Sequence, residues 1–94
     1  MITEIATITV SAGNEAAFEA AMRDGGLANL AACPGVGKVQ FGRGVEDPSK
    51  FAFVVEWESL EAHGAARKTD AFGAFRSAMG SMTAGGSMEH FTLG

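Results

Sequence analysis

The sequence has no tyrosine, a single cysteine and no cluster of basic residues, and these shortages exclude several classes of protein. With Cys33 alone the chain forms no internal disulfide and no cysteine-based metal site. Its seven basic residues are scattered and the formal net charge is −4. We therefore expect no surface for nucleic acid or for an anionic membrane, since both need a basic face.

The N-terminal run 2–10 is too short and too polar for a signal peptide or a membrane span. A cytoplasmic protein is the simplest expectation. The length of 94 residues suits one domain spanning 1–94, although 47% of the residues are hydrophobic. A domain this small buries only a limited share of its surface. The high apolar content therefore favours self-association.

Alternation of apolar residues predicts strands at 2–10, 36–45, 51–58 and 88–93, of which 51–58 is the strongest. Asn14 is the expected N-cap of a helix. At Gly25-Gly26 we expect either a bend in this helix or a short second segment from Leu27 to Ala32. Two further helices are predicted, one beginning at Ser59 and the other at Thr69-Asp70, and Gly85-Gly86 mark a loop.

The predicted order β-α-β-β-α-β indicates an α+β domain of the ferredoxin-like class, with a four-stranded antiparallel sheet and helices on one face. The other face keeps Ile5, Ala52 and Val54 and is therefore partly apolar. A second copy of the chain is expected to cover it, which gives a homodimer packed sheet on sheet.

The segment EWESLEAHGAARKTDAFGAFRSAM at 56–79 resembles the strand-to-helix signature of the antibiotic biosynthesis monooxygenase family. NEAAFEAAM on the first helix, CPG at its end and HF in the last strand extend the resemblance over nearly the whole chain. The resemblance implies a dimeric α/β barrel with a pocket between sheet and helices. Some members oxidise polyketide phenols or quinols with O₂ and no metal or flavin, others degrade haem, and others do isomerase-like chemistry.

The haem-degrading branch carries an Asn, a Trp and a His where this sequence has Ala6, Ala66 and Arg76, so the comparison excludes haem. Quinol-oxidising relatives often carry a His at the position of Ala66. The polyketide-oxidising branch keeps a Trp, as here at Trp57.

That branch places an Asn, a Tyr and an Arg where this chain has Phe53, His63 and, approximately, Arg76. Because the chain has no tyrosine, a phenolic contact to a substrate requires a substitute, and His63 stands at that position.

The candidate catalytic residues are His63 as a base and Arg76 as the stabiliser of a substrate anion. Trp57 is the candidate stacking wall. Further substrate contacts are expected from Phe53, Ala6, Ala66 and Phe75. The structural alternatives are a core Trp57, a partly exposed His63 and a solvated Arg76, and Arg67 has the same standing as Arg76.

Glu4 shares the parity of Ala6 and Ile8, which directs it to the helix-covered face unless the strand end frays into solvent. His90 is expected to be structural or to lie at the dimer contact. The two histidines, His63 and His90, stand at no metal-binding spacing, so neither a metal nor another cofactor is expected.

Three functions fit these residues. The first is a cofactor-independent monooxygenase that uses O₂ on a small hydroxylated aromatic or quinol. The second is a non-catalytic dimeric module that binds a small apolar ligand, and the third is an isomerase on the same scaffold.

Overall fold

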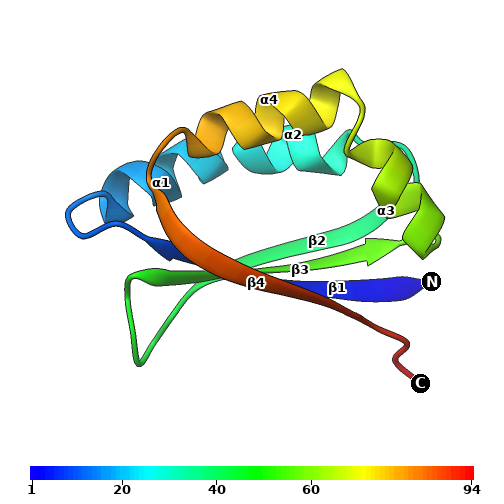
Figure 1. Cartoon of the computed structure of the whole chain (residues 1–94), viewed down its shortest axis with the longest axis horizontal. Coiled ribbons are helices and arrows are strands. Elements are labelled where there is room, and N and C mark those ends of the chain that lie inside the picture. The colour runs from blue at the N-terminus through cyan, green and yellow to red at the C-terminus, as the bar shows by residue number, and fades with distance from the viewer.

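The computed structural model describes residues 1–94. Its four strands form one antiparallel sheet in the order β2-β3-β1-β4. The strands are β1 (Ile2–Val10), β2 (Val36–Arg43), β3 (Lys50–Trp57) and β4 (Thr83–Phe91). All helices lie on one side of this sheet (Figure 1). The expected α+β, ferredoxin-like class is confirmed.

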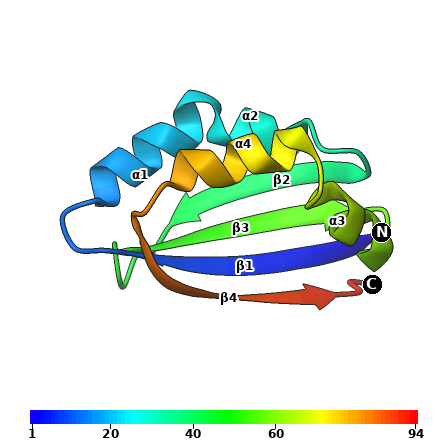
Figure 2. The same ribbon diagram turned by 45° about the horizontal axis from the view of Figure 1, so that its top comes forward.

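The covering layer consists of α1 (Glu15–Ala21), η1 (Met22–Gly26), α2 (Leu27–Ala31), α3 (Leu60–Ala66) and α4 (Asp70–Met79). Figure 2 shows α1, α2 and α4 lying along the sheet, with α3 at the end of β3. The expected bend is present: Asp24 leaves helical geometry and Gly25 has φ 125°, a conformation that favours glycine. The bend keeps both helix segments packed on the sheet.

Side-chain caps fix the starts of the last two helices. Ser59 Oγ accepts a hydrogen bond from the Ala62 N–H at 3.0 Å. Thr69 Oγ1 accepts one from the Phe72 N–H at 3.3 Å. Such caps satisfy backbone donors that a first helical turn leaves free. They set where α3 begins after β3, and hence where the side chains of α3 point.

The strongest predicted strand provides the centre of the core. Phe51, Phe53, Val55 and Trp57 alternate along β3, and all four are at most 2% exposed. They face the helices, where Phe18 packs its ring 4.9 Å from that of Phe51. Burying one such aromatic side chain contributes about 2 to 3 kcal/mol, so β3 anchors the helical layer.

The prediction for the last strand was wrong in its extent. β4 begins at Thr83, so Gly85 and Gly86 lie inside the strand and not in a loop. Gly86 is opposite Ile8, and a Cβ added there would lie 2.7 Å from the Thr7 carbonyl oxygen. Gly86 thus marks a close approach of two backbones inside a strand. From composition alone, the glycine pair indicated a turn.

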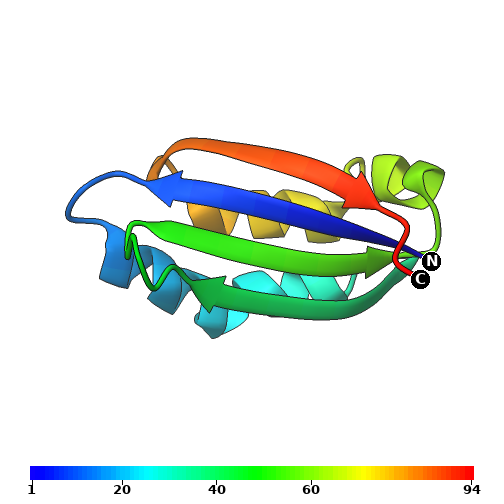
Figure 3. The same cartoon turned by 90° about the horizontal axis from the view of Figure 1, so that it is seen from below.

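The opposite face of the sheet carries no helix (Figure 3). Ile5 and Phe91 are each 40% exposed on this face, and Val54 is half-buried beside them. This bare face is the one expected to hold apolar side chains. No helix of the chain is both long and apolar enough to cross a membrane.

The two adjacent glycines of β4 allow a matched test of the close approach. Gly86→Ala is expected to lower the free energy of unfolding by about 1 to 3 kcal/mol, because the new methyl group meets the backbone of β1. Gly85→Ala, where nothing lies within 4 Å, is the control and should leave stability unchanged or slightly raised. Urea unfolding followed by circular dichroism measures both, and equal midpoints for the two variants would contradict the close packing.

Candidate functional site

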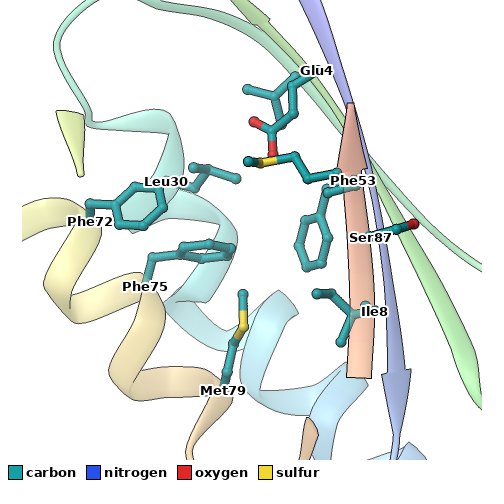
Figure 4. A pocket seen from close by; sticks show the side chains of 12 residues that line it. Glu4, Ile8, Leu30, Phe53, Phe72, Phe75, Met79 and Ser87 are labelled. Carbon is teal, nitrogen blue, oxygen red and sulfur yellow. The ribbon is translucent and has the colours of Figure 1, made fainter. Parts of the chain in front are cut away.

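A cavity of about 290 Å³ lies between the sheet and the helices. Nine of its twelve lining residues are hydrophobic, and Figure 4 shows Leu30, Phe53, Phe75 and Met79 around it. Phe72, Val55, Ala6, Ile8 and Met88 complete the apolar lining. Of the substrate contacts expected from the sequence, the cavity brings together Ala6, Phe53 and Phe75.

Glu4 is the charged residue in the cavity wall. It lies in β1 opposite Val55 on one side and His90 on the other, and it is 7% exposed. Figure 4 shows its carboxyl group among the apolar side chains. The parity argument for Glu4 therefore holds, and the alternative of a frayed strand end is wrong.

Trp57 holds this carboxylate. Its indole Nε1–H donates a hydrogen bond of 2.8 Å to Glu4 Oε1. Burial raises the pKa of the Glu4 carboxyl, while the Trp57 hydrogen bond and the charges of His90 and Arg67 act in the opposite direction. Burial is the largest of these influences, so Glu4 holds a proton more tightly than an ordinary glutamate.

His63 stands beside the pair formed by Glu4 and Trp57. It comes from α3, is 2% exposed, and stacks on the Trp57 ring at 4.4 Å with an interplanar angle of 10°. The alternative of a partly exposed His63 is therefore wrong. Its Nε2 lies 3.5 Å from Glu4 Oε1, and its Nδ1 lies 2.7 Å from Nε2 of His90. The imidazole thus connects the carboxyl group to His90 through its two opposite nitrogens.

Burial lowers the pKa of His63 to about 4, and the positive charges of Arg67 and His90 act in the same direction. His63 is therefore neutral at pH 7, with one N–H and one lone pair. When Glu4 is a carboxylate, the hydrogen-bond partners assign the proton of His63 to Nε2, which faces the carboxylate. Nδ1 then accepts from His90 Nε2–H.

The remaining predicted residues lie outside the cavity wall. Trp57 and Ala66 are buried in the core, 0% and 1% exposed, and neither is among the lining residues. Arg76 is exposed; its guanidinium lies 5.2 Å from the centre of the Phe72 ring, and its Nη2 donates to the Arg67 carbonyl at 3.3 Å. The charge of Arg67, like that of His90, acts on both Glu4 and His63.

Glu4, His63 and His90 form a cluster that the sequence analysis did not assemble. Their donor atoms lie within 4.8 Å of one another. Within the cluster, Glu4 lies beside Nε2 of His63 and His90 lies beside its Nδ1. The arrangement is that of a hydrogen-bonded chain. The one signal in the sequence was the parity of Glu4, because the partners come from β4 and α3.

The depressed pKa of His63 makes stability depend on pH. The unfolded chain protonates His63 near its ordinary pKa of 6.5, whereas the folded chain does so near 4. Between these values the unfolded state binds the extra proton, so the contribution of His63 is full above pH 6.5 and is lost as the pH falls toward 4.

His63→Phe keeps an aromatic ring on Trp57 and removes the titration. The stability advantage of the native chain over this variant is expected to shrink by about 1 to 3 kcal/mol from pH 7 to pH 4. Glu4 is present in both proteins, so its opposite dependence is largely cancelled in the comparison. Urea midpoints measured across this range test the effect, and a gap that stays constant would show that His63 charges freely in the folded state.

A family model described as antibiotic biosynthesis monooxygenase matches residues 1–78. No curated protein matches the chain. A crystal structure from Bordetella bronchiseptica, of a protein provisionally named as such a monooxygenase, is 30% identical with a TM-score of 0.88 and covers 98% of this chain and 95% of its own.

A structure from Caulobacter crescentus with the same provisional name is 27% identical, with a TM-score of 0.80 over 98% of this chain and 88% of its own. SnoaB from Streptomyces nogalater, a cofactor-independent oxygenase, shares the fold at 21% identity, with a TM-score of 0.81 over 98% of this chain and 91% of its own. Because this family model matches most of the chain, the chain belongs to the antibiotic biosynthesis monooxygenase family.

Proposed function

We propose that the chain is a cofactor-independent monooxygenase that uses O₂ on a small hydroxylated aromatic or quinol bound in the cavity. The observation that carries this proposal is the carboxyl group of Glu4 in the wall of an otherwise apolar cavity. Family membership and the shared fold with the cofactor-independent oxygenase SnoaB support it.

The shape and lining of the cavity favour a small, flat, apolar substrate. Its volume of about 290 Å³ lies at the lower end of the range for ligand pockets. Phe53 and Phe75, which meet edge to face at 5.6 Å, offer ring edges and faces to an aromatic molecule. A hydroxyl of such a molecule has Glu4 as its ionisable partner in the wall.

In the proposed reaction Glu4 accepts the hydroxyl proton, because an electron-rich anion transfers an electron to O₂ more readily than the neutral phenol does. The resulting aryloxyl radical and superoxide combine into a carbon-bound peroxide, which takes up a proton. Loss of the ring C–H proton then breaks the O–O bond, and the leaving hydroxide is protonated to water. Phenol and O₂ give quinone and water, and the substrate supplies all the electrons.

This proposal changes the roles expected from the sequence. Glu4 takes the position of base that was expected of His63, and His63 acts through Glu4. Trp57 donates to the carboxylate and stacks on His63 in place of stacking on substrate. Arg67, whose charge reaches Glu4, takes the electrostatic part that was expected of Arg76.

Glu4→Gln tests the assignment, since the amide still accepts from Trp57 but cannot take a proton. Oxygen uptake with a panel of hydroquinones and anthrones in metal-free buffer should show kcat lowered about 100-fold or more, with KM little changed. Glu61→Gln, at an exposed position of α3, is the control and should retain activity. Full activity in Glu4→Gln would remove Glu4 from the mechanism, and no uptake by the native chain with any substrate would remove monooxygenation.

An isomerase is the second candidate. The raised pKa of Glu4 favours it, because a carboxyl group that takes up and returns a proton can catalyse a proton-transfer reaction, and such a reaction needs no O₂. Turnover that persists without oxygen would favour this candidate. Melting shifts with the same compounds but no turnover would instead favour a ligand-binding module.

We also infer that the chain works as a homodimer whose two copies meet through the bare face of the sheet. The exposed Ile5 and Phe91 and the half-buried Val54 support this arrangement, since one face of the sheet already buries its apolar side chains under helices.

Ile5→Lys should shift the mass measured by light scattering from about twice 9.7 kDa to the monomer value, because a charge at the centre of an apolar contact is costly to bury. Val45→Lys, at a position 90% exposed in the β2–β3 loop, is the control and should remain dimeric. A monomeric native chain, or a dimeric Ile5→Lys variant, would contradict the sheet-on-sheet contact.

A further inference from the structure

Three side chains lead from the cavity to the edge of the sheet. Glu4 lies in the cavity wall, His63 is buried beside it, and His90 is half-buried on β4, the edge strand. We propose that they form a proton wire through which the cavity carboxyl exchanges protons with solvent at His90. The proposal rests on the proposed function only in taking the cavity as the site of chemistry.

The contacts have the connectivity that a wire requires. His63 Nε2 lies 3.5 Å from Glu4 Oε1, and His63 Nδ1 lies 2.7 Å from His90 Nε2. An imidazole accepts a proton at one nitrogen while releasing one from the other, so the ring transmits a proton without turning. The shorter contact is already a hydrogen bond, and the longer one is the contact that must shorten for a proton to pass.

The wire has two arrangements with the same number of protons. In the first, Glu4 is protonated and donates to His63 Nε2, while His63 Nδ1–H donates to a neutral His90. In the second, Glu4 is a carboxylate, His63 carries its proton on Nε2, and His90 is protonated on both nitrogens.

Passing from one to the other breaks the Glu4 O–H and the His63 Nδ1–H bonds. It forms an N–H bond at His63 Nε2 and another at His90 Nε2, and no electron is transferred. His90 then releases a proton from Nδ1, and the excess charge leaves the interior.

The charges around His63 keep the cation away from the middle of the wire. Arg67, at the end of α3, disfavours a positive His63, while its field and that of His90 favour a negative Glu4. The other neighbours of the ring, Trp57 from β3 and Phe72 from α4, carry no charge. His63 is thus neutral in both arrangements, and in the second arrangement the charges lie on Glu4 and His90.

In the proposed reaction this path carries the proton away from a newly formed substrate anion. A proton left on Glu4 faces the anion across the cavity and returns to it readily. Moved to His90, it is separated from the anion by two hydrogen bonds, and it travels back to Glu4 when the peroxide needs it.

Exchange of the His63 ring proton with water tests the wire without substrate or oxygen. In ¹⁵N-labelled protein, His90→Gln still donates to His63 Nδ1 but cannot pass a proton on. The His63 N–H is therefore expected to exchange about 10-fold or more slowly in His90→Gln than in the native chain. Glu61→Gln, at an exposed position of α3 outside the wire, is the control. Its His63 N–H should exchange at the native rate.

The Trp57 indole proton, which also faces Glu4, reports opening of the core in the same spectra. Its exchange should be the same in all three proteins. Equal exchange rates of the His63 N–H in the native chain and His90→Gln would overturn the wire. Slowing of the Trp57 proton to the same extent would also overturn it, because the substitution would then act by changing how often the core opens. Fast native exchange that slows in His90→Gln supports the wire even if no substrate is oxidised, so the two proposals fail separately.

Discussion

The hydrogen bond from the Trp57 indole to the Glu4 carboxylate is the interaction on which the rest of the site depends. Glu4 is 7% exposed, and a carboxyl group so far from water costs several kcal/mol when it is left without partners. The indole Nε1–H of Trp57 is its first partner, at 2.8 Å. Nε2 of His63, whose ring stacks on Trp57, lies 3.5 Å from the same oxygen. Satisfying one buried carboxyl group therefore fixes side chains from β1, β3 and α3 relative to one another, and through His63 it reaches β4.

Much of the fold followed from local pattern, and the site did so only in part. The alternation along β3 predicted the core strand because side chains of period two reveal the buried face directly. The same parity placed Glu4 inward. The contact of His63 with His90 could not be predicted, because it depends on the register of β4 against β1. That register was hidden by Gly85 and Gly86, which indicate a loop in the sequence. In the structure both lie inside β4, and Gly86 approaches the backbone of β1 closely.

Adjacent residues of β1 point to the two opposite faces of the sheet. Glu4 points to the cavity and Ile5, the next residue, to the bare face. Because successive side chains of a strand point to opposite faces, a slip of one residue in register would move the Glu4 carboxyl group away from Trp57 and His63 and onto the bare face. The family fold and the proposed chemistry thus place the same demand on the register of β1.

The stacking of His63 on Trp57 raises the question of which protonation state the pair favours. A protonated imidazole over an indole face gains about 1 to 2 kcal/mol from the cation–π attraction. Burying that charge costs several kcal/mol, and His63 is 2% exposed with Arg67 nearby. Desolvation therefore wins, as the pKa of about 4 indicates. A neutral ring with two nitrogens in use connects Glu4 to His90 without holding a charge of its own, which is the property that a proton path through buried side chains requires.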